Sequence, residues 1–275
     1  MQHLTFPVTV ADDEAELTKL AKNPEWTPHQ AAWIAAYQAY RANSGSPFAV
    51  APQNFGPGVH DRQYKLYDNR KGSGELRRMR RKKGLKSCPV CGSPVIGDLD
   101  HYLPRTVFPE FSIMRANLIP ACTHCNSGVK GSTVHGENPR RFIHPYFDRW
   151  AEQAIWQVEI ISPFKAARFI PRALPSLEEP QKEIVAFHLE NVLGIQFDLS
   201  TANEWSSLPT QIKLRDPKLT TTSVTHQLTM ELRVALDARG ANSWLAALLR
   251  GILSNPHAIE YLRNEAIASV LPPEV

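Results

Sequence analysis

The sequence predicts an α+β fold that is mainly helical, with a small cysteine-containing module between two helical regions. Three observations support this prediction. Apolar residues recur at helical spacing before residue 44 and after residue 180, four cysteines fall in two pairs between them, and two short segments after residue 155 alternate like strands. We therefore divide the chain into regions 1–59, 60–148 and 149–275.

The first region, 1–59, is predicted to be helical. Residues 11–23 form a short amphipathic pattern with acidic residues in its first turn, where they favour the helix dipole. Thr27 is predicted to cap a second helix that has Pro28 at its first position and runs to Asn43. The buried stripe expected of this helix comprises Trp33, Ala36, Tyr37 and Tyr40. Residues 44–58 are rich in Gly, Pro and Ser and predict a loop.

The second region, 60–148, carries the positive charge of the chain. The net charge of +4 divides into −2, +8 and −2 over the three regions. After a predicted helix at 61–67, a helix at 75–83 opens a strongly basic stretch. Seven residues in this stretch are predicted to bind nucleic-acid phosphates: Arg77, Arg78, Arg80, Arg81, Lys82, Lys83 and Lys86. The alternative is an ordinary solvated helix face.

The third region, 149–275, is expected to serve as scaffold or as a partner-binding surface. Residues 156–162 and 167–171 alternate as strands and are predicted to pair as a hairpin. Helices are expected at 180–192, 223–236 and 242–253. The aromatic and aliphatic residues of these segments are expected to form core rather than a site.

The chain is expected to be cytoplasmic. No segment approaches the roughly 18 apolar residues of a membrane helix, and the acidic N-terminus lacks the pattern of a signal peptide. We expect no contact with a membrane. In a reducing compartment, cysteines in C-x-x-C pairs are expected to bind a metal rather than to form disulfides.

Cys88-Pro-Val-Cys91 and Cys122-Thr-His-Cys125 are separated by 30 residues. Each pair brings two sulfurs to one ion, and two pairs complete the tetrahedral Cys₄ set of a structural zinc site. His124 lies inside the second pair and is expected to remain outside the ligand set.

The residues between and after these pairs resemble the HNH, or ββα-metal, endonucleases. The resemblance rests on Asp100-His101-Tyr-Leu-Pro104, on Asn117-Leu118, and on Cys122-x-x-Cys125-Asn126 followed by Lys130-Gly131. It covers about 45 of the 275 residues. It implies a central ββα finger stapled by zinc, and hydrolysis of nucleic-acid phosphodiesters with a divalent metal.

The expected chemistry needs a base, a cation and a stabiliser of the leaving group. On a strand, Asp100 and His101 point to opposite sides, so the carboxylate can face the metal while the imidazole faces the attacking water. His101 is the expected base, because histidine titrates near neutrality, and activity is expected to rise between about pH 6 and 7. Asp100 and Asn126 supply hard oxygen ligands that suit Mg²⁺ or Mn²⁺. By resemblance, Asn117 holds the loop of His101.

Several assignments stay open. His144 is the second candidate for the base, with a further metal ligand, a phosphate donor or a packed structural residue as its other interpretations. Lys130, Arg140 and Arg141 are expected either to contact phosphates or to be surface charge.

Phe108-Pro-Glu-Phe-Ser112 and Phe142-Ile-His-Pro-Tyr-Phe-Asp148 resemble a bacterial subgroup that includes the nucleases of Septu-type antiphage systems. The subgroup implies a defence role beside an ATPase or another defence-system protein. The expected substrate is DNA, cut with little sequence preference. The alternatives are an RNA-cleaving HNH effector, since nothing distinguishes the two sugars, and a non-catalytic zinc protein that binds nucleic acid.

Overall fold

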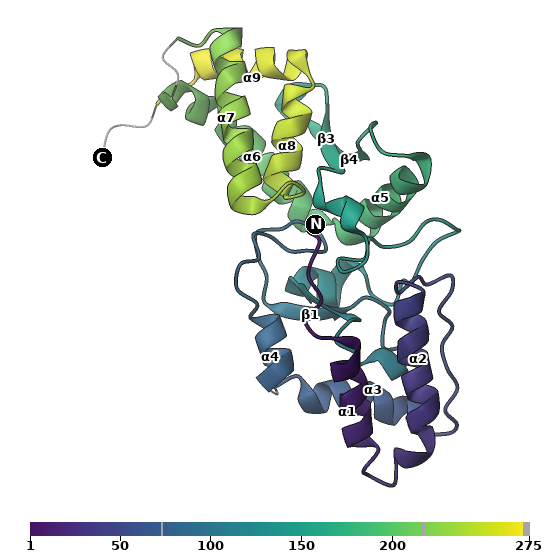
Figure 1. The fold of residues 1–275 in the computed structure, drawn as a ribbon. Coiled ribbons are helices and arrows are strands. Elements are labelled where there is room, and N and C mark those ends of the chain that lie inside the picture. The colour runs from purple at the N-terminus through teal and green to yellow at the C-terminus, as the bar shows by residue number, and fades with distance from the viewer. Residues whose placement is uncertain (73, 216–217, 272–275) are drawn as a thin grey trace.

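The computed structural model describes residues 1–72, 74–215 and 218–271. Over these residues the fold is α+β, about half helical, with two small antiparallel sheets. Figure 1 shows two lobes, with the N-terminus at their junction.

The N-terminal lobe contains α1 (Val10–Leu20), α2 (Gln30–Ala42), α3 (Val59–Arg70), α4 (Gly74–Arg80), β1 (Asp98–His101) and β2 (Leu118–Ala121). The C-terminal lobe contains β3 (Trp156–Ile161), β4 (Arg168–Ala173), α5 (Glu179–Val192), α6 (Ile195–Arg215), α7 (Thr221–Arg239), α8 (Trp244–Leu253) and α9 (Pro256–Ala268).

The first helices pack on the segment around β1 and β2 rather than forming a body of their own. The predicted stripe of α2 is confirmed, because Trp33, Ala36, Tyr37 and Tyr40 are all buried. The Trp33 indole donates a hydrogen bond to the carbonyl oxygen of Glu110. The buried carboxylate of Asp13 on α1 accepts from the Arg115 guanidinium at 2.8 Å and also pairs with Arg41. These contacts fix α1 and α2 against the residues between the two strands.

The start of α2 differs from the prediction. Thr27 to His29 form a 3₁₀ turn, and α2 itself begins at Gln30. The Thr27 hydroxyl donates back to the carbonyl oxygen of Ala21 at 2.7 Å, so it does not cap the helix. Thr27 therefore ties α2 to the end of α1.

β1 and β2 form a short antiparallel pair that we call the central hairpin. Asp98 lies opposite Ala121, and His101 lies opposite Leu118. A five-residue π-helical turn, Cys125–Val129, follows the hairpin and packs against β1. The helix of the expected ββα finger is thus replaced by a single turn. The basic helix is also shorter than expected, because α4 ends at Arg80 and the lysines after it lie in a loop.

In the C-terminal lobe the predicted hairpin is confirmed, since β3 pairs antiparallel with β4 from Trp156 opposite Ala173 to Ile161 opposite Arg168. α8 packs on β3 at Gly251, where an added Cβ would lie 1.7 Å from the carbonyl oxygen of Val158. Only a glycine permits this approach. The helices expected near α5, α7 and α8 are present, and α6 and α9 are two that the sequence analysis missed.

Among the described residues, no helix combines the length and apolar character needed to cross a bilayer.

Candidate functional site

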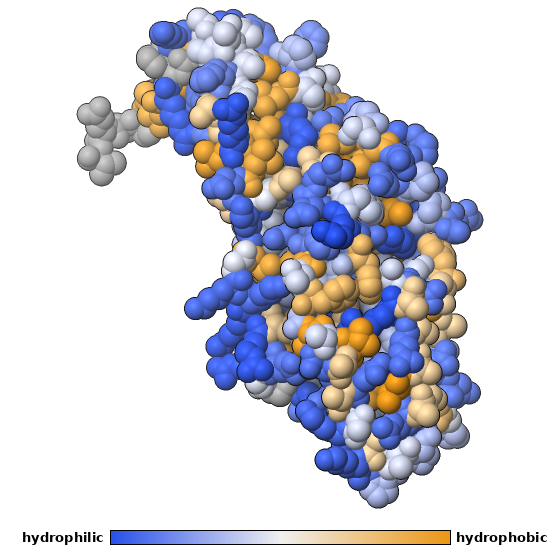
Figure 2. Space-filling model, viewed as in Figure 1, coloured by the Kyte–Doolittle hydropathy of each residue, from blue (hydrophilic) through white to orange (hydrophobic). Residues whose placement is uncertain are grey.

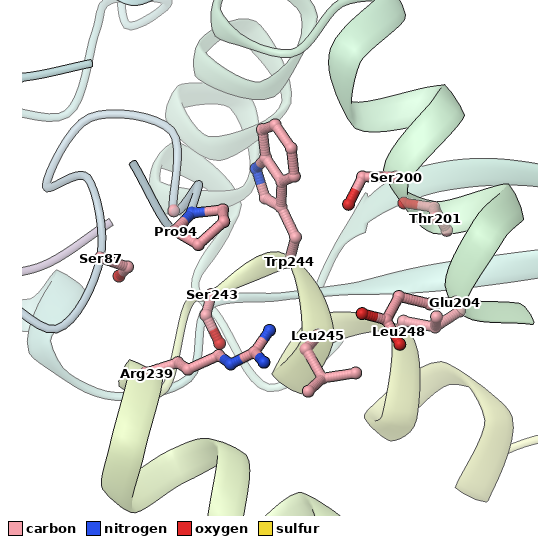
Figure 3. Close-up of a pocket in the computed structure, with 11 residues that line it drawn as sticks. Ser87, Pro94, Ser200, Thr201, Glu204, Arg239, Ser243, Trp244, Leu245 and Leu248 are labelled. Atoms are coloured by element: carbon pink, nitrogen blue, oxygen red, sulfur yellow. The ribbon is translucent and has the colours of Figure 1, made fainter. Parts of the chain in front are cut away.

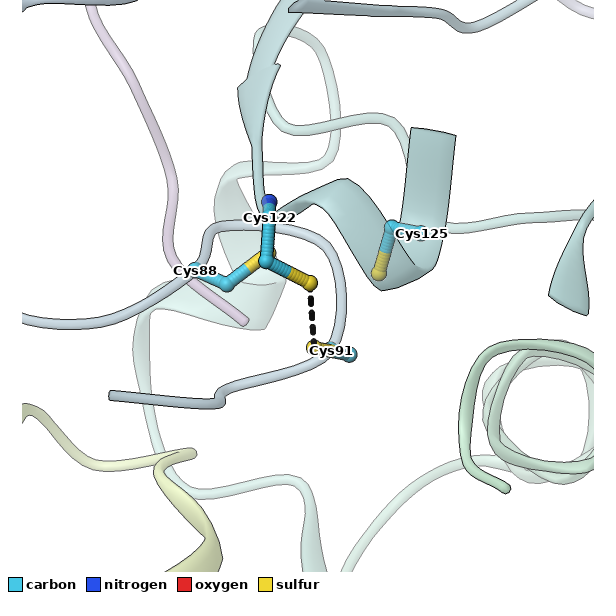
Figure 4. A group of neighbouring side chains, drawn as sticks. All are labelled: Cys88, Cys91, Cys122 and Cys125. Atoms are coloured by element: carbon cyan, nitrogen blue, oxygen red, sulfur yellow. Dashed lines mark hydrogen bonds between the residues drawn. The ribbon is translucent and has the colours of Figure 1, made fainter. Parts of the chain in front are cut away.

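The four cysteines gather at one point of the N-terminal lobe. Cys88 and Cys91 lie in the loop after α4, Cys122 follows β2, and Cys125 begins the π-helical turn (Figure 4). All four are buried, and their sulfur atoms lie within 4.8 Å of one another. The predicted meeting of the two C-x-x-C pairs in one cluster is thus confirmed.

The geometry of this cluster suits zinc. The Sγ atoms of Cys91 and Cys122 are 3.7 Å apart. Four sulfurs at about 2.3 Å from a zinc ion form a tetrahedron with edges of about 3.8 Å. The backbone amide of Cys122 lies 3.4 Å from Cys88 Sγ, in the position that supports a bound thiolate. These residues can therefore hold a structural zinc ion. His124 is not part of the cluster, as expected.

A cleft of about 390 Å³ opens beside β1. Three of the four predicted catalytic residues, Asp100, His101 and Asn126, line it together. Its wall also contains aromatic and charged residues from α3 and the residue after it, from α4, from the start of β1 and from the loop after β1, namely Tyr64, Tyr67, Asp68, Lys71, Arg80, Asp98 and Arg105. The fold therefore brings the predicted metal ligands and the predicted base to one polar cavity.

Asp100 forms a buried ion pair with Lys130. The Lys130 ammonium is 3.0 Å from Asp100 Oδ2 and also donates to the carbonyl oxygen of His101. Burial raises the pKa of Asp100, and the Lys130 charge opposes this shift. Lys130 is only 3% exposed. The interpretation of Lys130 as ordinary surface charge is therefore wrong, because the side chain is buried. The phosphate contact stays a prediction, and in this structure the ammonium pairs with Asp100.

The His101 ring is held at its Nε2 atom. Nε2 lies 2.9 Å from the carbonyl oxygen of Ser112, which can only accept, so the proton of the neutral ring is on Nε2 and the lone pair is on Nδ1. The ring packs edge-on against Tyr67. Burial lowers the pKa of His101 to about 3. The imidazole is therefore neutral at physiological pH, and the rise in activity expected between pH 6 and 7 does not follow from this ring.

Asn117 lies outside the cleft and holds the loop between β1 and the short 3₁₀ turn at 109–111. Its Oδ1 accepts from the Leu103 amide at 2.8 Å, and its Nδ2 donates to the carbonyl oxygens of Leu103 and Phe111. The side chain is fully buried. Asn117 thus makes the contacts expected of a residue that orients a loop.

Asp98 is a cleft residue that the sequence analysis missed. The Asn126 amide donates to Asp98 Oδ2 at 2.6 Å, and Arg80 lies 3.7 Å from Asp98 Oδ1. Asp98 and Asp100 are two residues apart on β1 and so share one face of the strand. This alternation was visible in the sequence and could have identified Asp98. Its contact leaves the Asn126 amide oxygen as the atom that can ligate a cation.

His144 is not at the cleft. It is fully buried, and its Nδ1 accepts from the Tyr146 amide at 3.1 Å. Burial lowers its pKa to about 3. Of the four interpretations left open, the packed structural residue fits this geometry.

Most of the basic stretch is exposed. Six of its seven residues are at the surface, namely Arg77, Arg78, Arg81, Lys82, Lys83 and Lys86, while Leu76 and Met79 anchor α4 to the core. Figure 2 shows strongly hydrophilic side chains projecting over α4. Arg80 differs, because it turns into the cleft. Arg141 is bound by two hydrogen bonds to Asp148, and Arg140 pairs with Glu190, so neither guanidinium is a free phosphate contact.

A smaller hollow of about 80 Å³ separates the first cysteine pair from the C-terminal helices. The Trp244 indole stands there between the segment of Pro94 and the helix of Ser200 and Thr201 (Figure 3). It donates a hydrogen bond to the carbonyl oxygen of Cys91 at 2.7 Å. The residues around this hollow connect the two lobes through the hydrogen bond from Trp244 to Cys91.

Comparison with known proteins gives one partial relative. The chain is 43% identical to protein Ea31 of Escherichia phage lambda over 67 residues, which are 23% of this chain and 22% of that protein. The match therefore spans less than a quarter of either sequence. No family model and no solved structure matches the chain.

Proposed function

We propose that this protein is a metal-dependent endonuclease of the HNH type that hydrolyses phosphodiester bonds of nucleic acid, with DNA as the expected polymer. The observation that carries the proposal is the meeting of Asp100, His101 and Asn126 in one cleft. The order of the elements, a hairpin that carries Asp100 and His101 and a turn that carries Asn126, supports it as well.

In this proposal His101 is the general base. Its Nε2–H is occupied by the Ser112 carbonyl, so Nδ1 accepts the proton of the attacking water. Because the ring is already neutral, no proton has to leave it before it acts. A buried neutral imidazole is a weak base, and an approaching phosphate would raise its basicity as the proton is transferred.

Asp100 and Asn126 are the proposed ligands of a Mg²⁺ or Mn²⁺ ion. Such an ion, when bound, polarises the phosphate and stabilises the leaving oxygen. Carboxylate and amide oxygens fit it, since both are hard donors. Asp98 would orient Asn126 through the 2.6 Å hydrogen bond between them.

The exposed basic residues of α4 and of the following loop are proposed to bind the phosphate backbone. Arg80 and Arg105 extend the row of arginines to the wall of the cleft, where Arg80 lies 3.7 Å from Asp98 and Arg105 pairs with Asp68 at 2.8 Å. Contacts with the phosphate backbone are independent of base sequence, which agrees with a nuclease of low sequence preference.

The test is incubation of the purified protein with supercoiled plasmid and with structured RNA, in buffers with Mg²⁺, Mn²⁺ or neither. The proposal predicts divalent-dependent conversion of the plasmid to nicked or linear forms. Cleavage of RNA but not of plasmid would contradict DNA as the substrate and would favour an RNA-cleaving HNH effector. Binding of both polymers without cleavage in any buffer would favour the non-catalytic zinc protein.

We also propose that the nuclease acts in defence against invading nucleic acid beside an ATPase, because of the subgroup resemblance of residues 108–112 and 142–148. Purification of the tagged chain from its own host cells tests this part. Recovery of an ATPase at a fixed ratio supports it, and recovery of the chain alone contradicts it.

A further inference from the structure

Three fully buried polar side chains from distant segments form a continuous hydrogen-bonded chain. Tyr40 lies on α2, Asn117 precedes β2, and His144 lies in the segment between the two lobes. The Tyr40 hydroxyl oxygen is 2.9 Å from His144 Nε2 and 3.1 Å from Asn117 Oδ1. None of the three lines the cleft.

The direction of every proton in this chain is determined by its surroundings. The Tyr146 amide donates to His144 Nδ1, so that atom carries a lone pair. A neutral imidazole then has its proton on Nε2 and donates it to the Tyr40 oxygen. The Tyr40 hydroxyl has one proton, and both oxygens near it, Asn117 Oδ1 at 3.1 Å and the Ala116 carbonyl oxygen at 3.5 Å, can only accept. The shorter distance assigns the proton to Asn117 Oδ1.

The same Asn117 oxygen accepts from the Leu103 amide, and its nitrogen donates to the carbonyl oxygens of Leu103 and Phe111. If the amide turned over, its nitrogen would face the Leu103 amide and the Tyr40 proton. The chain thus selects one orientation of Asn117. That orientation closes the loop between His101 and Ser112, whose carbonyl oxygen holds His101 Nε2.

His144 is itself held firmly. Its backbone amide donates to Asp148 Oδ2 at 2.6 Å, and Arg141 fixes Asp148 through two hydrogen bonds. The turn after α2 covers the ring at Gly45, which has φ of +65°. A Cβ there would lie 2.8 Å from His144 Cδ2 and 3.0 Å from Tyr40 Cζ. This arrangement keeps the ring within reach of Tyr40.

We propose that Tyr40 and His144 are positioning residues, which fix the Asn117 amide and through it the loop that holds the His101 ring against Ser112. The catalytic consequence rests on the proposed function, whereas the effect on the His101 ring does not. A core histidine that only fills space would have no such effect.

The test is Tyr40→Phe, with Tyr37→Phe as its matched control. Tyr37 lies one turn earlier on α2 and is also buried, and within the described part of the chain its hydroxyl has no hydrogen-bond partner. Both variants lose one oxygen atom, and only Tyr40→Phe breaks the chain. In ¹⁵N-histidine-labelled protein we expect Tyr40→Phe to shift the His101 ring signals and to speed exchange of its Nε2–H about fivefold or more, since the variant loses the hydrogen bond that fixes the Asn117 amide. Tyr37→Phe should leave both unchanged.

His144→Gln and His144→Leu give a second comparison, which also serves if Tyr40→Phe does not fold. Glutamine can still donate to the Tyr40 oxygen, so His144→Gln should retain the wild-type His101 signals, and leucine cannot. Unchanged His101 signals in both Tyr40→Phe and His144→Leu would overturn the inference.

Cleavage assays separate this inference from the proposed function. If the wild type cleaves, a folded Tyr40→Phe should lose roughly 10-fold to 100-fold in rate, because small misplacements of a reacting group have costs of this order. If the wild type does not cleave but Tyr40→Phe still shifts the His101 signals, the positioning role is supported and the nuclease proposal is contradicted. Wild-type cleavage by Tyr40→Phe would overturn the catalytic part of the inference.

Discussion

The Lys130 ammonium lies 3.0 Å from the Asp100 carboxylate inside the protein, where it neutralises a proposed metal ligand. Both side chains are almost completely removed from solvent. A buried carboxylate is costly without a cation beside it, so this lysine stabilises β1 whenever no divalent ion does.

Lys130→Met should therefore lower the free energy of unfolding by about 3 kcal/mol, the usual cost of breaking a buried pair. Added Mn²⁺ should restore more stability in this variant than in the wild type, because a cation beside Asp100 replaces the lost charge. Urea unfolding of the zinc-containing protein, with and without Mn²⁺, measures both effects. Lys182→Met is the control, since Lys182 pairs with Glu179 at the surface and such pairs contribute about 0 to 1 kcal/mol. Equal losses in the two variants would argue against a special role of Lys130.

Zinc removal should disrupt the N-terminal lobe. The chain has four cysteines and all belong to the cluster, so a thiol reagent should find none reactive in the zinc-bound protein and all of them after chelation. Elemental analysis should give about one zinc per chain. A zinc-free preparation with an unchanged melting temperature would contradict the structural role of the metal.

The hydrogen bond from Trp244 to the Cys91 carbonyl should slow zinc loss, because it holds the first cysteine pair against α8. Trp244→Phe should release zinc to a competing chelator several-fold faster. Trp205→Phe is a matched control, since its indole makes the same kind of bond to the Phe164 carbonyl far from the cysteines. Equal rates of zinc release in the two variants would show that the contact does not couple the lobes to the metal.

Glu110 should make stability depend on pH. It is fully buried, and burial raises its pKa to about 7 from an ordinary value of 4.5. A raised pKa in the folded state favours the protonated form, so this contribution is complete below pH 4.5 and is lost as the pH rises through 7. Relative to Glu110→Gln, the wild type should lose roughly 3 kcal/mol of unfolding free energy between pH 4 and 8.

Urea unfolding of the wild type and of Glu110→Gln across this pH range measures the difference in their unfolding free energies. Glu183→Gln is the control, because it makes the same substitution at an exposed glutamate. The buried histidines, whose pKa values are lowered, destabilise the fold in acid and act equally in both proteins. A difference between wild type and Glu110→Gln that is constant with pH would contradict the raised pKa.

The sequence predicted those features that depend on local spacing. Two C-x-x-C pairs gave the cysteine cluster, period-two alternation gave the β3 and β4 hairpin, and the spacing of Trp33 to Tyr40 gave the buried face of α2. Each signal lies within a few residues of the chain and needs no knowledge of distant contacts.

The helix α6 was missed because its sequence contains Pro209 and several Ser and Thr residues, which favour loops. Its buried residues nevertheless recur at helical spacing, from Phe197 through Thr201 and Trp205 to Leu208 and Ile212. Packing of this face against α9 and β4 overrides the weak local preference.

Burial was the main property that the sequence did not reveal at the cleft. Lys130 reads as a surface cation until its pairing with Asp100 is seen, and His101 reads as an ordinary imidazole until its burial lowers its pKa. The contact of Tyr40 with His144 joins residues 104 positions apart, a separation that no local pattern encodes.

Cleavage by His101→Ala tests the nuclease proposal most directly. The proposed role of His101 is proton transfer alone, and removal of a general base typically lowers the rate by about 10² to 10⁴-fold. Single-turnover cleavage of a labelled DNA duplex in Mg²⁺ or Mn²⁺ should therefore fall at least 100-fold or so in His101→Ala. Zinc content and duplex binding should stay at the wild-type level, and His257→Ala, an exposed histidine on α9, should cleave normally. Wild-type cleavage by His101→Ala, or no cleavage by the zinc-loaded wild-type protein, would contradict the proposal.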